Sequence, residues 1–387
     1  MELSAYFQPV NLEEIAFTKS NFWTNIGSTA SIYSTEGAFP ELESAQLALV
    51  GLPHNSDHEG GLSAPNEIRR FLYPLMLPNE SMSLVDLGNI MPGKTEEDTQ
   101  YAVTEIMYKL LEKNITVIAM GGAQRYTFSS YKAYEILGRV INISSIDSRF
   151  DIGNDQEPLN DSNWLSHIVA QQPNFLFNFS NLAFQTYFNG LQMVKLMDEL
   201  NFDAYRLGAI QADMVRAETL VRNADLVSID LSSVRLSDAP GQRQGSPHGL
   251  YGEELCRLTR FAGMSDKLTS IGFYNYSPLM DRNGQTAHLL AHAIWYFIDG
   301  FYCRTADFPH RDKQNYKHFM VTLNGEYEIS FYKSMKSERW WMEVPYDGEL
   351  RDRYQRHLLI PCTYDDYQQA QMNEIPELWW KYFQRLN

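Results

Sequence analysis

The sequence has no long hydrophobic run, no excess of basic residues and no closely spaced cysteines. A membrane-spanning helix needs about 18 apolar residues in succession, and a secretory signal has a basic stretch followed by an apolar core, so we expect neither. Acidic residues outnumber basic ones by 48 to 32, which gives a formal net charge of −16. We therefore expect no nucleic-acid partner, because binding to phosphates requires a basic face.

The three cysteines, Cys256, Cys303 and Cys362, are odd in number and far apart in the chain. This pattern predicts free thiols and favours a reducing, cytoplasmic location. The rest of the composition predicts a globular fold, since 44% of the residues are hydrophobic and only 21% are charged. The length of 387 residues allows one large domain or two smaller ones.

Short apolar runs alternate with longer amphipathic segments through the first 300 residues. Such alternation predicts an α/β fold with a mostly parallel sheet and helices on both faces. The predicted strands are 47–52, 83–87, 115–120, 140–146, 175–179, 226–229 and 268–273. The predicted helices are 66–75, 96–113, 127–137, 190–200, 207–223, 253–262 and 286–301.

The chain changes character near Cys303, which divides it into a main domain (1–302) and a C-terminal extension (303–387) packed on it. Residues 318–332 predict a β-hairpin around Asn324-Gly325. A three-residue loop places apolar residues opposite one another. The paired residues are then Leu323 with Tyr327, Val321 with Ile329, and Phe319 with Phe331.

Four of the seven tryptophans, Trp340, Trp341, Trp379 and Trp380, lie in the last 48 residues. Aromatic residues in this number either pack the extension onto the main domain or form a surface that binds a protein partner. The sequence leaves both readings open.

Polar residues gather directly after three predicted strands. They form Gly121-Gly122-Ala123-Gln124 after one strand, the segment from Asp147 to Asp151 after the next, and Asp230-Leu231-Ser232 after a third. The carboxyl ends of parallel strands meet at one edge of a sheet, where ligands bind. We therefore expect these side chains to line one site.

These segments resemble the motifs of the arginase, agmatinase and formimidoylglutamase family of ureohydrolases. The family reads Gly-Gly-Asp-His, then Asp-Ala-His-x-Asp, then Ser-x-Asp-x-Asp-x-x-Asp. The resemblance runs from about Leu47 to Phe301 and includes the helix start Ala64-Pro65-Asn66-Glu67-Ile68-Arg69. It implies a three-layer α/β/α arginase-like fold, and a site in which two manganese ions activate a hydroxide for hydrolysis of C–N bonds in linear amidines.

Only part of that site is present. Asp147, Asp151 and Asp230 match three of the family's ligands, while Gln124 and Arg149 stand where the family has its two histidines. In the same resemblance Ser232 replaces the second aspartate of the last motif, Arg235 its trailing aspartate, and Asn275 the substrate-orienting glutamate. A guanidinium has no lone pair for a metal and would repel one.

Two charge balances are open for the remaining carboxylates. In one, Arg149 neutralises Asp147 and Asp230 with help from Arg125 and Arg235, and no metal or other cofactor is bound. In the other, a single divalent ion (Mn, Mg or Ca) binds oxygen atoms of Gln124, Asp147, Asp151 and Asp230, a ligand set that favours magnesium or calcium.

The first balance predicts a catalytically inactive binding or scaffold protein with an unidentified protein partner, and the resemblance suggests a homo-oligomer. The second predicts an active hydrolase of formimidoylglutamase, arginase or agmatinase type. A third reading is a pocket that binds a small guanidino compound without turning it over.

Other candidates are weaker. His54 and His58 follow the first strand and could form a replacement metal site or a solvated loop. His167 lies where the family has a proton-shuttling histidine, but the sequence favours a histidine on a surface helix. His288 and His292 share one face of a helix without the glutamate of a zinc-protease motif. Ser232 has no histidine that would make it a nucleophile.

Overall fold

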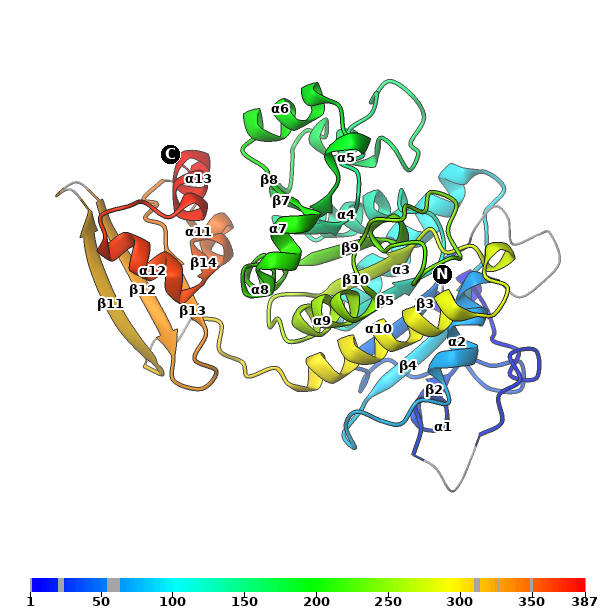
Figure 1. The fold of residues 1–387 in the computed structure, drawn as a ribbon. Helices are drawn as coiled ribbons and strands as arrows, with labels where there is room; N and C mark the ends of the chain where they lie inside the picture. Colours follow the sequence, from blue (N-terminus) through cyan, green and yellow to red (C-terminus); the bar gives the residue numbers. More distant parts are fainter. Residues whose placement is uncertain are drawn as a thin grey trace.

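The computed structural model describes residues 2–19, 24–53, 63–309, 314–323, 325, 327–348 and 351–386. It contains a large twisted sheet with helices on both faces, and a smaller antiparallel sheet beside it (Figure 1). The predicted three-layer α/β/α architecture with a C-terminal hairpin is therefore confirmed. Within the described residues, no helix combines the length and apolarity that crossing a bilayer requires.

The large sheet has the strand order β1-β4-β3-β5-β10-β9-β6-β7-β8, with β2 paired to β4. All its pairings are parallel except that of β1 with β4. The strands are β1 (Phe7–Gln8), β2 (Ser31–Ile32), β3 (Leu47–Gly51), β4 (Leu84–Ile90), β5 (Thr116–Met120), β6 (Ile141–Ile146), β7 (Leu176–Phe184), β8 (Asp203–Arg206), β9 (Leu226–Asp230) and β10 (Ser270–Tyr274).

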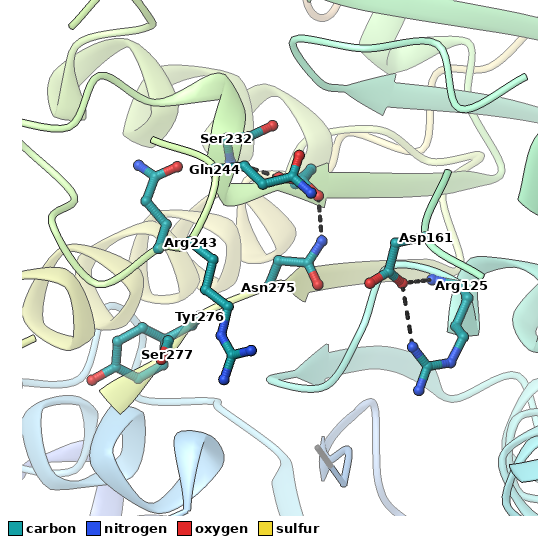
Figure 2. Close-up of a pocket in the computed structure, with 10 residues that line it drawn as sticks. Arg125, Asp161, Ser232, Arg243, Gln244, Asn275, Tyr276 and Ser277 are labelled. Atoms are coloured by element: carbon teal, nitrogen blue, oxygen red, sulfur yellow. Dashed lines mark hydrogen bonds and ion pairs between the residues drawn. The ribbon is translucent and has the colours of Figure 1, made fainter. Parts of the chain in front are cut away.

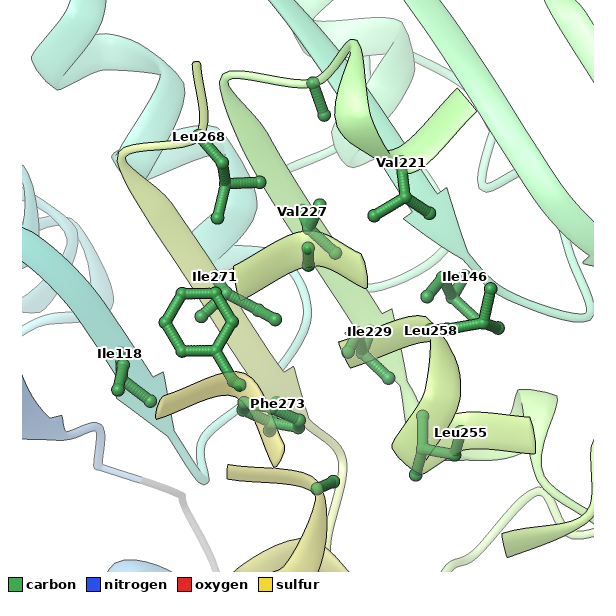
Figure 3. Packing of buried hydrophobic residues seen from close by; sticks show 14 of the residues in the cluster. Ile118, Ile146, Val221, Val227, Ile229, Leu255, Leu258, Leu268, Ile271 and Phe273 are labelled. Carbon is green, nitrogen blue, oxygen red and sulfur yellow. The ribbon is translucent and has the colours of Figure 1, made fainter. Parts of the chain in front are cut away.

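The central strands are almost continuously apolar because both of their faces are covered. On one face Ile118, Val227 and Ile271 belong to a buried cluster that also contains Leu255 and Leu258 of a covering helix (Figure 3). On the other face a second cluster contains alternate residues of the same strands. The main core therefore lies in two layers, one on each side of the sheet.

Helices α2, α8, α9 and α10 cover the first face, and α3, α4 and α5 cover the second. The helices of the main domain are α1 (Ile26–Thr29), α2 (Ala64–Leu72), α3 (Glu96–Glu112), α4 (Tyr126–Ile136), α5 (Trp164–Val169), α6 (Leu191–Glu199), α7 (Leu207–Ala212), α8 (Met214–Arg222), α9 (Gly252–Gly263) and α10 (Gln285–Tyr302). Short 3-10 turns occupy Leu3–Tyr6, Thr186–Phe188, Leu231–Ser233, Pro278–Met280 and Gln355–His357.

Two of the differences from the sequence prediction have a clear local cause. The single helix expected over 207–223 is broken at Asp213, whose backbone is not helical and whose carboxylate caps α8 by accepting from the N–H groups of Val215 and Arg216. Strand β8 was not predicted, because its polar sequence Asp203–Arg206 lies at the edge of the sheet and carries no apolar run.

The C-terminal extension forms a four-stranded antiparallel sheet in the order β11-β12-β13-β14. The predicted register is confirmed, since Leu323 pairs with Tyr327, Val321 with Ile329 and Phe319 with Phe331. Asn324 of the turn lies outside the described residues. The elements are β11 (Tyr316–Leu323), β12 (Tyr327–Ser334), β13 (Trp340–Glu343), α11 (Arg351–Tyr354), β14 (Leu359–Cys362), α12 (Tyr364–Gln371) and α13 (Glu377–Leu386).

Three of the four C-terminal tryptophans, Trp340, Trp341 and Trp379, are buried, while Trp380 is 36% exposed. The indole N–H of Trp379 donates to the carbonyl of Glu343 at 2.8 Å, and the ring stacks on Phe383. Packing inside the extension therefore accounts for most of its aromatic residues.

Contacts with the main domain are made at the amino ends of the large-sheet strands. Arg356 pairs with Asp225, directly before β9, at 2.9 Å, and Lys381 pairs with Asp203 at the start of β8 at 3.2 Å. The hydroxyl of Tyr382 accepts from the side-chain amides of Asn178 and Asn223, which lie 204 and 159 residues earlier. The extension thus covers the edge of the sheet opposite the carboxyl ends of its strands (Figure 1).

Candidate functional site

The carboxyl ends of β5, β6 and β9 bring the predicted residues together. After β5, Gly121 and Gly122 have φ of +77° and +71°, and a Cβ on Gly122 would lie 2.7 Å from the Cβ of Leu52. Glycine is therefore required for this turn. It directs Gln124 beneath the sheet edge, where it is 1% exposed and donates to the hydroxyls of Ser145 and Ser228.

Asp147 follows β6 and is 1% exposed. Its Oδ1 accepts from the backbone N–H of Arg149 at 2.8 Å and from the hydroxyl of Ser232 at 3.4 Å. Its Oδ2 is buried and has no hydrogen-bond partner among the residues that the structure describes. Asp151 has a left-handed backbone (φ +53°), and its carboxylate accepts from the indole N–H of Trp164 at 3.0 Å.

Asp230 ends β9, and both of its oxygens are hydrogen-bonded. Oδ1 accepts from the backbone N–H of Ser232 at 2.6 Å, and Oδ2 accepts from the side-chain amide of Asn275 at 2.5 Å (Figure 2). Asn275 itself has φ +63°. Asparagine tolerates this left-handed conformation better than most residues, which helps to hold its amide at the carboxylate.

The three carboxylates lie close enough to influence one another. Burial, followed by the charges of Asp151 and Asp230, raises the pKa of Asp147 well above its usual value. Burial and the charge of Asp230 raise the pKa of Asp151 to about 7. Burial also raises the pKa of Asp230, against the hydrogen bonds from Ser232 and Asn275. The cluster therefore holds protons more tightly than ordinary carboxylates do.

The predicted arginine network is wrong. The guanidinium of Arg149 lies 4.2 Å from the centre of the Phe188 ring and donates to the hydroxyl of Ser148. Within the residues that the structure describes, no ion pair joins Arg149 to Asp147 or Asp230.

The two assisting arginines also have other partners. Arg125 pairs with Glu96 and Asp161, and Arg235 pairs with Asp238. These partners are less buried, so pairing there avoids the cost of moving a guanidinium into the interior.

A cavity of about 240 Å³ opens beside Asp230 (Figure 2). Its wall combines two acidic residues with two arginines and several amides and hydroxyls. The lining residues are Arg125, Asp161, Asp230, Ser232, Gln242, Arg243, Gln244, Asn275, Tyr276 and Ser277. Sequence reasoning missed six of them as site residues, because they come from loops without a recognisable motif: Asp161, Gln242, Arg243, Gln244, Tyr276 and Ser277.

The residues present do not fit a two-metal centre. In the described ranges, no group of three or more His, Cys, Asp or Glu side chains is arranged to hold a metal ion. Gln124 can offer only an amide oxygen, and Arg149 offers no lone pair at all. Among the described residues, the buried Oδ2 of Asp147 lacks a hydrogen-bond partner.

The other predicted candidates lie outside the cluster. His167 is on α5, where its ring bonds to the carbonyl of Glu157 and contacts Phe128. His288 and His292 lie on the exposed side of α10, with ring centres 4.4 Å apart. His54 and His58 fall outside the described residues.

Comparisons with known proteins bear on the family of the chain. A model of the arginase family matches residues 45–299. A formimidoylglutamase of Halalkalibacterium halodurans is 25% identical over 281 residues, covering 66% of this chain and 86% of that protein. A formimidoylglutamase of Clostridium tetani is 24% identical, covering 64% and 79%.

Two solved structures share the fold. Formimidoylglutamase of Bacillus subtilis superposes with a TM-score of 0.63 at 18% identity, covering 75% of this chain and 96% of that one. Formiminoglutamase of Trypanosoma cruzi with Mn²⁺ superposes with a TM-score of 0.62 at 16% identity, covering 69% and 97%.

Proposed function

The chain belongs to the arginase family, and from that membership we propose that it is a catalytically silent member that acts by binding. The observation that carries the proposal is the position of Arg149. It stands at a histidine of the family motif, it cannot donate a lone pair to a metal, and its guanidinium lies on the Phe188 ring.

Protons provide the charge balance in this proposal. Three buried carboxylates without a cation would repel one another, and the pKa of Asp151 near 7 and the raised pKa of Asp147 support a proton held between them. Hydrolysis of an amidine also requires an activated water, and two metal ions are the family's means of lowering its pKa. Ser232 is no substitute, since no histidine of the described residues bonds to it.

The cavity beside Asp230 is suited to a small ligand that carries both charges. Asp161 and Arg125 pair with each other at 3.6 Å on its wall, and Asp230 and Arg243 add a further charge of each sign. A guanidino or amidine compound with a carboxylate, such as arginine or formimidoylglutamate, has matching groups. We propose that such a compound is bound without being turned over.

A protein partner is a further part of the proposal. The extension offers apolar surface for this partner at Trp380 and Tyr364, both exposed, and at Met320 on β11.

The cysteines are free, which supports a cytoplasmic location.

The test is a metal count by mass spectrometry, combined with assays for urea and formamide release. We expect fewer than about 0.1 manganese ions per chain and no product from arginine, agmatine or formimidoylglutamate. The matched control is the triple variant Gln124→His, Arg149→His, Ser232→Asp, which restores the family's ligand types and should gain manganese. Two manganese ions in the unmodified chain would refute the proposal.

The alternative is an amidine hydrolase that uses one divalent ion. The partnerless Oδ2 of Asp147 favours it, because a buried carboxylate oxygen rarely lacks a partner. Gln124, Asp147, Asp151 and Asp230 would supply oxygen ligands, which suit magnesium, calcium or manganese. One ion per chain together with product release would establish this alternative and would exclude the silent form.

A further inference from the structure

A second and larger cavity lies away from the strand-end site, on the solvent side of α9 and α10. Its volume is about 610 Å³, and it shares no lining residue with the cavity beside Asp230. One wall comes from the segment after β9, which contributes Arg235 and Asp238, and the others come from the two helices.

The side chains that line this cavity include more basic than acidic residues, whereas the chain as a whole is acidic. Arg235, Arg257 and Arg260 line it together with two histidines, against the two acidic residues Asp238 and Glu253. Arg235 is paired with Asp238 at 2.8 Å, and Arg260 with Asp299 at 2.7 Å. Arg257 is exposed and forms no ion pair within the described part of the chain, so its charge is available to a ligand.

Two helices begin at the cavity. Gly252 opens the twelve-residue α9 and Gln285 opens the eighteen-residue α10, and both line it. The amino end of a helix carries partial positive charge and attracts anions. The potentials of the two helix ends therefore add to those of the arginines.

The side chain of Asp238 shows that the electrostatic potential at this wall is positive. Its Oδ2 accepts from the backbone N–H of Gly252 at 2.9 Å and its Oδ1 from the guanidinium of Arg235. Burial acts to raise the pKa of Asp238, but the hydrogen bonds from Arg235 and Gly252 outweigh it, and the pKa is lowered. Negative charge is thus stabilised at this wall.

Flat and apolar side chains form the remaining surface. The guanidinium of Arg235 lies 3.9 Å from the centre of the Tyr251 ring, which holds both groups in place. Tyr251 and Tyr296 are 45% and 39% exposed, and Leu289 lies between the helices. Such a wall suits a planar group.

His288 and His292 complete the cavity on α10. His288 stacks on Phe71 at 4.9 Å, and its ring centre is 4.4 Å from that of His292. Burial and the neighbouring His288 lower the pKa of His292. An anion beside the His292 ring would favour its protonated form.

We propose that the cavity between α9 and α10 is a second binding site, which takes an organic anion made of a planar ring and a carboxylate or phosphate. Arg257 and the histidines bind the anionic group, and Tyr251 and Tyr296 contact the ring. The site does not depend on the proposed function, because none of its residues lies in the acidic cluster.

The test is isothermal titration with phenyl phosphate as the probe. Benzoate shows whether a carboxylate serves equally, and inorganic phosphate shows what the ring contributes. We expect phenyl phosphate to bind more tightly than inorganic phosphate, and Arg257→Gln to weaken it roughly tenfold, as loss of a charge-assisted hydrogen bond does. Benzoate, which stays ionised across this range, should bind more strongly at pH 6 than at pH 8, and His292→Gln should reduce that difference.

The matched control is Arg243→Gln, which removes an arginine from the other cavity and should leave the affinity for phenyl phosphate unchanged. Thermal unfolding of each variant verifies that it is folded. The proposal is overturned if neither phenyl phosphate nor benzoate binds at millimolar concentration. It is overturned equally if Arg243→Gln weakens binding while Arg257→Gln does not, or if inorganic phosphate binds as tightly as phenyl phosphate.

Discussion

The guanidinium of Arg149 lies over the Phe188 ring at 4.2 Å, while its own backbone N–H donates to the carboxylate of Asp147. Arg149 therefore contacts Asp147 through its backbone N–H, and its guanidinium does not neutralise the three carboxylates. Substitution of Arg149 and substitution of the aspartates should therefore have different effects on the stability of the protein.

Arg149→Ala should have a small effect on stability. The backbone bond to Asp147 remains, and only a partly exposed cation–π contact and a hydrogen bond to Ser148 are lost, which together cost about 1 kcal/mol. Urea unfolding measures this loss, with Arg149→Lys as the control that keeps the charge. A loss above about 3 kcal/mol, the cost of breaking a buried ion pair, would show that the side chain neutralises an aspartate after all.

The acidic cluster should make the protein less stable as the pH rises. Asp147, Asp151 and Asp230 have raised pKa values when folded, so from about pH 4 to pH 7 the folded state binds more protons than the unfolded one. The free energy of unfolding from these groups therefore falls across that window.

Asp151→Asn should remove part of this pH dependence, because the amide does not titrate. Between pH 5 and pH 8 the variant should lose less stability than the unmodified protein, by on the order of a few kcal/mol. Urea unfolding at both pH values measures the difference. Equal losses in the two proteins would mean that Asp151 is ionised in the folded state across this range.

Asp225→Asn should destabilise the contact between the large sheet and the C-terminal extension. Asp225 is 1% exposed and is the carboxylate that faces both Arg356 at 2.9 Å and buried Lys267 at 3.7 Å. Its removal leaves a buried ammonium without a counter-ion, which costs about 3–5 kcal/mol. The exposed pair of Arg351 with Asp347 provides the control, since Asp347→Asn should change stability by less than about 0.5 kcal/mol. Similar values for both variants would contradict this account.

Trp379→Ala should be far more damaging than Trp380→Ala. Trp379 is fully buried and bonded to Glu343, so its truncation costs about 3–5 kcal/mol. Trp380 is partly exposed and should cost clearly less, as thermal unfolding of both variants will measure. If binding to an isolated partner were lost in Trp380→Ala while stability was kept, the extension would serve as the interaction surface.

The sequence was sufficient for the central strands, because their burial on both faces leaves continuous apolar runs. It was also sufficient for the hairpin register, which only one pairing of apolar residues satisfies. It failed at β8, where an edge strand is polar, and at Asp213, where a capping side chain competes with helix continuation.

The candidate site was likewise predicted only in part. The positions of Gln124, Asp147, Asp151 and Asp230 follow from motifs at strand ends. The partners of Arg125 and Arg149 do not, because Phe188, Asp161 and Glu96 belong to segments distant in sequence that only the folded chain brings together. The equal numbers of aspartates and arginines predicted a neutral network of ion pairs. These numbers could not predict which carboxylate or ring each guanidinium contacts.

The bonds from Tyr382 to Asn178 and Asn223 span 204 and 159 residues, and this separation bears on how the chain folds. Closing such long loops costs entropy before any contact is gained, and contacts of this range slow folding. We expect the large sheet to form first, with Asp203 and Asp225 still open to water, and the extension to dock in a later and slower step. During that interval we expect the amino edge of the sheet to be open to proteases and to association with other chains.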